Sequence, residues 1–217
     1  MTLTFAAAAF VVTAIVLSPP FDRLSDGSFA WHMVQHLVLL FVVPLLALLS
    51  RPFEFFRRIF GNAAAARALR ALRGTHLAFH PALALGAFVG VLWLTHFSGL
   101  YEYALDHEWA HVCEHVLFVA AGLLFWTPVI APSPVRPQPF PVRLLYLFVA
   151  LPQGALLAVA LEAARYPLYA HYAAVLSNAQ ALTDQDNAAA VMWIGGGAIT
   201  FAAFLGTFGA WAARERV

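Results

Sequence analysis

The sequence of 217 residues has no lysine, a single cysteine and few charged side chains of either sign. Only 11% of its residues are charged, against roughly 25% in a soluble globular domain. A chain with so little polar surface would not stay in solution, so we predict an integral membrane protein. The net charge of +1 argues against a nucleic-acid partner, and one cysteine excludes an internal disulfide framework. Other residue types must carry the chemistry.

The chain also lacks the short motifs of several enzyme classes, namely a Gly-rich phosphate loop, a nucleophile elbow and a zinc-protease helix. His111 is followed by Val112, and Glu114 stands at the wrong offset to be the general base of a zinc protease. We therefore expect a metal-binding or assembly protein rather than an enzyme. A membrane redox enzyme remains the alternative.

What the chain has instead is a series of apolar runs close to the 20 or so residues that cross a bilayer as a helix. The six runs are residues 3–17, 29–49, 77–97, 110–130, 141–161 and 188–211. No repeat or soluble segment interrupts them, so we predict one membrane domain over residues 1–217, an all-α polytopic bundle. The first run has no basic residue before it and no good cleavage site after it, so we interpret it as a retained helix.

The arginines predict the orientation, because cytoplasmic loops of membrane proteins are enriched in basic residues. With both termini in the cytoplasm, ten arginines fall on the inner side and only Arg23 and Arg165 on the outer side. Residues 51–73 interleave arginine with phenylalanine and leucine, which indicates an amphipathic helix on the inner membrane surface.

Histidine is concentrated at the external ends of these runs. His32 and His36 open the second run one helical turn apart, and His111 and His115 open the fourth in the same way. Side chains at i and i+4 share a helix face, so two such pairs on neighbouring helices could surround one small volume. Ionisable groups at membrane depth are costly, and a bound metal ion is the simplest use of four neutral imidazoles. We predict metal ligands here; the alternative is interfacial histidines hydrogen-bonded to loops.

Three further side chains are predicted to support this site. His96 ends the third run at a matching depth, as a further ligand or a supporting group. Glu114 and Asp184 could accept the second ring proton of a bound imidazole, although helix capping explains Asp184 equally well. Soft sulfur donors also lie at similar depth, and we interpret them as packing residues: Met33, Met192 and Cys113.

Neutral imidazole suits copper, zinc or nickel, so spacing alone leaves the metal open. A haem b protein would use one histidine from each of two helices with room for the macrocycle between them, and pairs one turn apart fit a small ion better. A copper permease would carry ligands near the bilayer midplane, where these runs are almost purely apolar. We rank the haem b protein and the copper permease below a protein that binds a small metal ion.

Four segments in combination carry a family likeness that extends from about Phe29 onward. They are His32-Met-Val-Gln-His36, His96 ahead of Gly99-Leu-Tyr101, His111-x-x-Glu-His115 leading into Gly122 and Trp126-x-Pro128, and Asp184-Gln ahead of Met192-Trp. With these segments the sequence resembles the CtaG family of integral membrane proteins. The resemblance implies a role in assembling a haem–copper cytochrome c oxidase in the bacterial cytoplasmic membrane. It also implies copper as the metal and an oxidase subunit as the partner.

The chain departs from that family in two respects. Its six apolar runs are fewer than the seven spans of longer members, and Gln153-Gly154 replaces a more apolar stretch of the fifth run. Both departures concern the number and packing of the helices, and neither touches the histidines.

Overall fold

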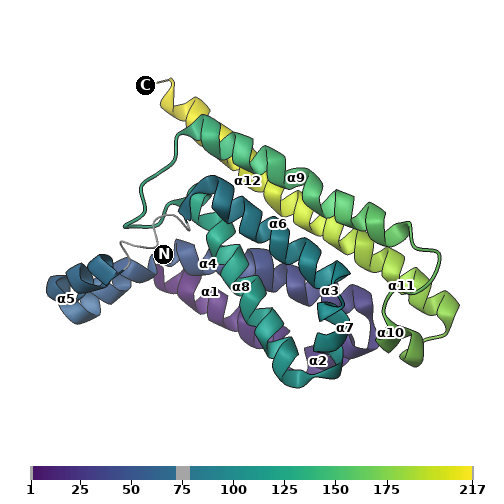
Figure 1. Ribbon diagram of the computed structural model, residues 1–217. Helices are drawn as coiled ribbons and strands as arrows, with labels where there is room; N and C mark the ends of the chain where they lie inside the picture. The colour runs from purple at the N-terminus through teal and green to yellow at the C-terminus, as the bar shows by residue number, and fades with distance from the viewer. Residues whose placement is uncertain (1, 72–78, 217) are drawn as a thin grey trace.

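The computed structural model describes residues 2–71 and 79–216, and every regular element within them is a helix (Figure 1). Four helices are long and apolar enough to cross a membrane alone, and two bent helix pairs bring the number to as many as six. The predicted all-α membrane bundle is therefore confirmed. Residues 77–78 of the third predicted run and 72–73 of the amphipathic segment lie outside the described residues.

The long helices are continuous, and two of them contain a π-helical turn. They are α3 (Phe29–Leu37) with η1 (Val38–Val42) and α4 (Val43–Leu49), then α8 (Glu108–Ile130), α9 (Phe140–Glu162), and α11 (Asn178–Ala190) with η3 (Val191–Gly196) and α12 (Gly197–Arg214). The last helix begins well before its apolar run at residue 188. Ser177 and Gln180 form a capping box that starts it there.

The remaining helices bend or lie at the ends of the bundle. Helices α1 (Thr2–Val16) and α2 (Pro19–Gly27) meet at 52°, and α6 (Pro81–Phe97) and α7 (Leu100–Asp106) meet at 66°. The second bend turns at Gly99, whose φ of +74° is in the left-handed region that favours glycine. Together with the short α10 (Ala170–Val175), α2 and α7 lie at one end of the bundle, whereas α1 begins and α12 ends toward the other end (Figure 1).

Helix α5 (Pro52–Ala71) lies beside the bundle at the end where α1 begins and α12 ends, and it is broken at Gly61 (Figure 1). Three of its large apolar side chains face outward, since Phe55, Ile59 and Phe60 are each more than half exposed. Such a surface suits contact with lipid headgroups and acyl chains. The membrane-surface position of this segment remains a prediction.

The helix formed by α3, η1 and α4 is central, because α1, α8 and α11 all pack against it. Pro44 cannot donate to the Leu40 carbonyl and its ring crowds that group, and the π-helical turn η1 accommodates the loss. The Trp126 indole donates to the nearby Phe41 carbonyl over 2.8 Å. Gly122 lets α8 approach this turn, because a Cβ there would collide with the Leu40 carbonyl and the Pro44 ring. This close contact sets the spacing between the two helices that carry the paired histidines.

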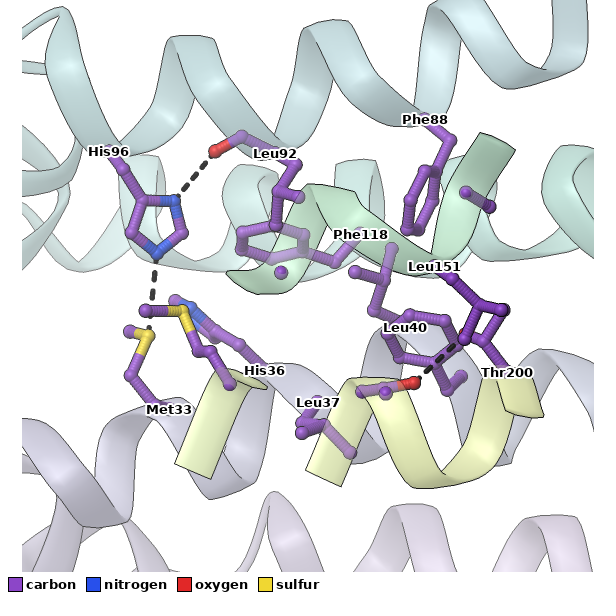
Figure 2. A pocket seen from close by; sticks show the side chains of 16 residues that line it. Met33, His36, Leu37, Leu40, Phe88, Leu92, His96, Phe118, Leu151 and Thr200 are labelled. Atoms are coloured by element: carbon purple, nitrogen blue, oxygen red, sulfur yellow. Dashed lines mark hydrogen bonds between the residues drawn. The ribbon is translucent and has the colours of Figure 1, made fainter. Parts of the chain in front are cut away.

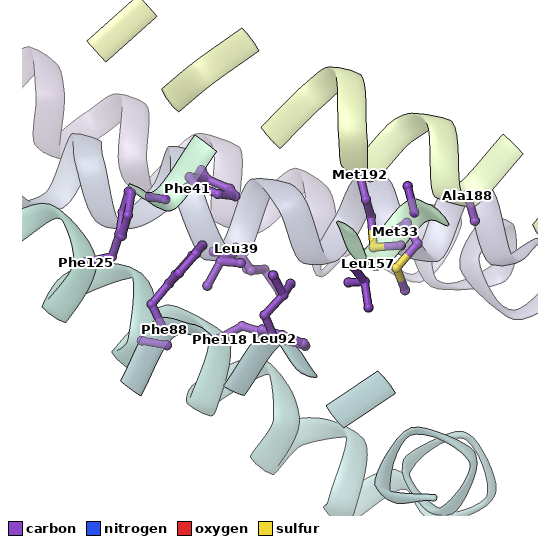
Figure 3. Packing of buried hydrophobic residues seen from close by; sticks show 14 of the residues in the cluster. Met33, Leu39, Phe41, Phe88, Leu92, Phe118, Phe125, Leu157, Ala188 and Met192 are labelled. Carbon is purple, nitrogen blue, oxygen red and sulfur yellow. The ribbon is translucent and has the colours of Figure 1, made fainter. Parts of the chain in front are cut away.

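Aromatic and aliphatic side chains pack together in the buried core of the bundle (Figure 3). Phe88 and Phe125 stack with ring centroids 4.4 Å apart, and Phe41 meets both rings edge-on. Such pairs contribute about 0.5–1.5 kcal/mol each beyond the apolar area that they bury. This apolar core separates the end of the bundle that holds α5 from the end where the histidines lie.

Candidate metal centre

Four histidines from two helices converge near the end of the bundle that holds α2, α7 and α10. His32 and His36 lie on α3, and His111 and His115 lie on the first turns of α8. One ring nitrogen from each residue belongs to a set whose members all lie within 4.8 Å of one another. The structure therefore brings together the four residues that the spacing of the sequence singled out.

The distances within this cluster suit a small ion. The Nε2 atoms of His32 and His36 are 2.9 Å apart, and His111 Nε2 is 3.2 Å from His32 Nε2. Metal–imidazole bonds of about 2.0–2.1 Å put two nitrogens of a tetrahedral ion about 3.4 Å apart. To share one tetrahedral ion, the widest pair of the set would have to approach by up to about 1.4 Å.

Several donor atoms of this cluster are buried without a partner. His32 is fully buried, and His36 is 4% exposed. Within the described residues, His36 Nδ1, His115 Nε2 and both carboxylate oxygens of Glu114 have no hydrogen-bond partner. Buried polar atoms are almost always satisfied in native structures, so unsatisfied atoms gathered at one place require a partner such as an ion or water. The residues present therefore fit a metal ion.

Glu114 adds a negative charge, when ionised, to the edge of the cluster. Its side chain is 6% exposed, and one carboxylate oxygen lies 3.8 Å from His36 Nε2. The predicted hydrogen bond from an imidazole to Glu114 is not formed among the described residues, where neither carboxylate oxygen has a hydrogen-bond partner. A carboxylate beside the ligands would instead offset the charge of a bound cation. The same carboxyl group without a cation is costly to bury.

A tyrosine that the sequence did not reveal fixes the orientation of His32. The Tyr172 hydroxyl on α10 lies 2.9 Å from His32 Nδ1 and donates to the Ser25 carbonyl over 3.3 Å. With its proton directed there, the hydroxyl can accept from Nδ1–H, and this tautomer of His32 would leave the Nε2 lone pair free toward the cluster. Burial raises the pKa of Tyr172, so the hydroxyl stays protonated. The Tyr101 hydroxyl, 3.1 Å away, extends this network.

Asp184 lies at the start of α3. Its carboxylate accepts from the Ser28 hydroxyl over 2.7 Å and from the Phe29 backbone N–H. It thus satisfies amide groups at the N-terminus of the helix that carries His32 and His36. Its effect on the histidines is exerted through the position of α3.

His96 lies beside the cluster and outside the set of four. Its Nδ1 is 2.8 Å from the Leu92 carbonyl, and its Nε2 is 3.4 Å from Met33 Sδ (Figure 2). His36 and His96 line a common cavity, so the two groups of side chains are adjacent. The predicted role of His96 as a ligand of the four-histidine cluster remains a proposal.

Comparison with known proteins places this chain in a family. The family model described as cytochrome c oxidase caa3 assembly factor matches residues 1–214. Uncharacterized proteins of Mycobacterium bovis and Mycobacterium tuberculosis are each 28% identical over 146 residues, which is 63% of this chain and 22% of each relative. A protein of Mycobacterium leprae is 25% identical over the same length. This chain therefore matches only a small part of those longer relatives, and no solved structure matches it significantly.

The family match extends over both histidine pairs, His96, Glu114 and Asp184. It agrees with the likeness found in the sequence segments around these residues. The chain belongs to the family of cytochrome c oxidase caa3 assembly factors.

Proposed function

We propose that this chain binds copper through its four-histidine cluster and supplies or stabilises that copper during assembly of a haem–copper oxidase. The observation that carries the proposal is the convergence of His32, His36, His111 and His115 within 4.8 Å. Imidazole is a ligand of copper, and copper is a metal that the oxidase itself requires. The membrane location follows from the apolar helices, and we propose the bacterial cytoplasmic membrane with the cluster toward its external side.

Two other metals or groups compete for this site. Zinc binds imidazole with similar geometry, so the ligand set alone does not choose between zinc and copper. Haem b is disfavoured by the spacing, because ring nitrogens 2.9–3.2 Å apart leave no room for a macrocycle between them. The unpartnered Glu114 carboxylate also suits a compact cation better than an apolar ring.

The functional test replaces the chain in its host by the His36→Ala/His115→Ala variant and measures copper in the purified oxidase. We expect oxidase polypeptides to be made but to contain much less copper than oxidase from cells with the parent chain. The matched control is His80→Ala/His107→Ala, which removes two exposed histidines. Oxidase with normal copper content in the double cluster variant would refute the proposed role.

A further inference from the structure

Beside the histidine cluster, a narrow cavity of about 40 Å³ brings two thioethers and two imidazoles to one place. Met33, His36, His96 and Met192 line it together with apolar side chains. Figure 2 shows Met33, His36 and His96 grouped at one end of the cavity, and Figure 3 shows the Met33 and Met192 side chains extending toward each other. A space of this volume can hold an ion or a few waters.

The hydrogen bonds around His96 leave the lone pair of its Nε2 atom facing the Met33 sulfur. Its Nδ1 lies 2.8 Å from the Leu92 carbonyl and 3.1 Å from the Thr95 hydroxyl. That hydroxyl donates its own proton to the Val91 carbonyl over 2.8 Å, so both neighbours of Nδ1 are acceptors. In neutral His96 the single ring proton is therefore on Nδ1, and Nε2 carries none.

The Nε2 atom of His96 and the Sδ atom of Met33 are 3.4 Å apart, and neither has a proton to offer. His96 is 5% exposed and Met33 is fully buried, so water from the bulk does not separate them. A doubly protonated His96 could donate to sulfur, but it would bury a positive charge among mostly apolar side chains, which is costly. Two lone pairs directed at each other at this distance are the arrangement that a shared cation requires.

The separation itself matches a soft metal ion. Bonds of about 2.0 Å to nitrogen and 2.3 Å to sulfur, meeting at a near-tetrahedral angle, hold the two donors about 3.4–3.5 Å apart. Thioether sulfur favours Cu(I) over zinc and over harder cations. His36 contributes an unpartnered, buried Nδ1 on the same side chain whose Nε2 faces the histidine cluster.

The backbone around the cavity supports the same interpretation. Pocket-lining side chains come from the two π-helical turns η1 and η3, including Leu40 and Phe41 on the first and Met192 on the second. π-Helical turns occur frequently at functional sites, because each one shifts the register of the side chains that follow it. We first inferred a packing role for Met33 because it lies beside the face of α3 that carries His32 and His36. The same position directs its side chain toward His96 on α6, so Met33 can pack in the core and also bind a metal ion.

We propose that Met33, His96 and Met192 form a second metal site, selective for Cu(I) and distinct from the four-histidine cluster, with His36 at the boundary between the two. The site rests on the proposed function only in the choice of copper as the physiological ion. Its place beside the cluster suits a holding position for monovalent copper before or after the histidine ligands.

The test measures Ag(I), a redox-inert mimic of Cu(I), bound to full-length protein purified in detergent. All proteins carry Cys113→Ser, because Cys113 is an exposed thiol that would itself capture silver. The first variant is Met33→Leu/Met192→Leu, which removes both sulfurs with little change in volume. The second is His111→Ala/His115→Ala, which removes half of the cluster. His96→Gln provides an independent route to the same loss, and circular dichroism checks folding.

We expect the parent and the His111/His115 variant to retain one Ag(I) per chain that the Met33/Met192 and His96 variants lose. Cu(I) bound to the parent should show sulfur at about 2.3 Å in X-ray absorption, absent after the methionine substitutions. The methionine variant should still bind Cu(II), which reports the histidine cluster separately. Equal silver content in the parent and the methionine variant, loss of silver in both variants, or no silver in the parent would each overturn the second site. A parent protein that retains Ag(I) but does not bind Cu(II) would refute the four-histidine cluster and leave the second site standing.

Discussion

Tyr172 controls His32 through one hydrogen bond, which makes it the most informative residue outside the ligand set. Tyr172→Phe removes the acceptor of His32 Nδ1–H, so the imidazole can take the other tautomer and place a proton on Nε2. We expect metal affinity to fall by roughly 10–100-fold, the usual effect of losing such a partner. A chelator competition titration measures it.

The control for Tyr172→Phe is Tyr166→Phe, because Tyr166 is 66% exposed. Without metal, the Tyr172→Phe protein should stay folded. Its free energy of unfolding should fall by about 1–3 kcal/mol, because His32 Nδ1 loses its hydrogen-bond partner. Identical affinities in the parent and Tyr172→Phe would show that the hydroxyl does not orient the ligand.

Glu114 is expected to matter mainly when the cation is present. Glu114→Gln keeps the shape of the side chain but removes the carboxyl group, which carries a negative charge when ionised and lies 3.8 Å from His36 Nε2. We predict that copper raises the thermal midpoint of this variant less than that of the parent. Differential scanning fluorimetry with and without copper measures the two increments, and equal increments would contradict a charge role for Glu114.

Among the helices, the contact of α8 with η1 decides whether the two histidine pairs meet. Gly122→Ala puts a methyl group into the Leu40 carbonyl and the Pro44 ring, so α8 must move away. We expect a loss of about 1–3 kcal/mol in stability and a larger proportional loss of copper affinity. Denaturation in mixed micelles and a copper titration measure the two effects.

Gly86→Ala is the matched control for that experiment, because a Cβ at Gly86 meets no described atom within 4 Å. Replacing glycine in an unobstructed helix interior generally stabilises the helix by about 0.5–1 kcal/mol. Equal behaviour of the two alanine variants would show that helix approach at Gly122 does not set the geometry of the cluster.

The start of α3 provides a second test at the scale of an element. Asp184→Ala removes the acceptor of the Ser28 hydroxyl and of the Phe29 amide, and the first turn of α3 carries His32. We predict a loss of about 1 kcal/mol in stability with a moderate loss of copper affinity. Asp186→Ala, at an exposed position on α11, the helix that also carries Asp184, should change neither the stability nor the copper affinity. An unaltered stability of Asp184→Ala would contradict the capping role.

Over the whole molecule, the helical membrane fold and the pairing of histidines could be predicted, because both depend on local pattern. An apolar run of sufficient length is enough to indicate a span, and i, i+4 spacing is enough to put two side chains on one face. The neighbours of those faces could not be predicted, because they depend on how each helix is rotated and bent.

Three contacts illustrate the part that depends on tertiary structure. Met33 meets His96 across 63 positions in sequence, and Tyr172 reaches His32 from a short helix in an otherwise irregular segment. Asp184 reaches α3 because the last helix starts ten positions before its apolar run. None of these pairs has a spacing that could reveal it, since the chain must turn several times before they meet.

The orientation of the bundle is a prediction that concerns the molecule as a whole. The arginine distribution places α5 in the cytoplasm and the α6–α7 end outside. With Cys113→Ser as background, Asp106→Cys in spheroplasts should react with a membrane-impermeant maleimide, and Asn62→Cys should react only after permeabilisation. The reverse pattern would put the histidine cluster on the cytoplasmic side.

The central claim, a metal site made by four histidines, is tested most directly by metal analysis of the purified chain beside the His36→Ala/His115→Ala variant. We predict at least one copper per chain in the parent after loading and dialysis, and the loss of the Cu(II) that the cluster holds in the variant. Retention of the same Cu(II) content by the folded variant would contradict the assignment of these histidines as ligands.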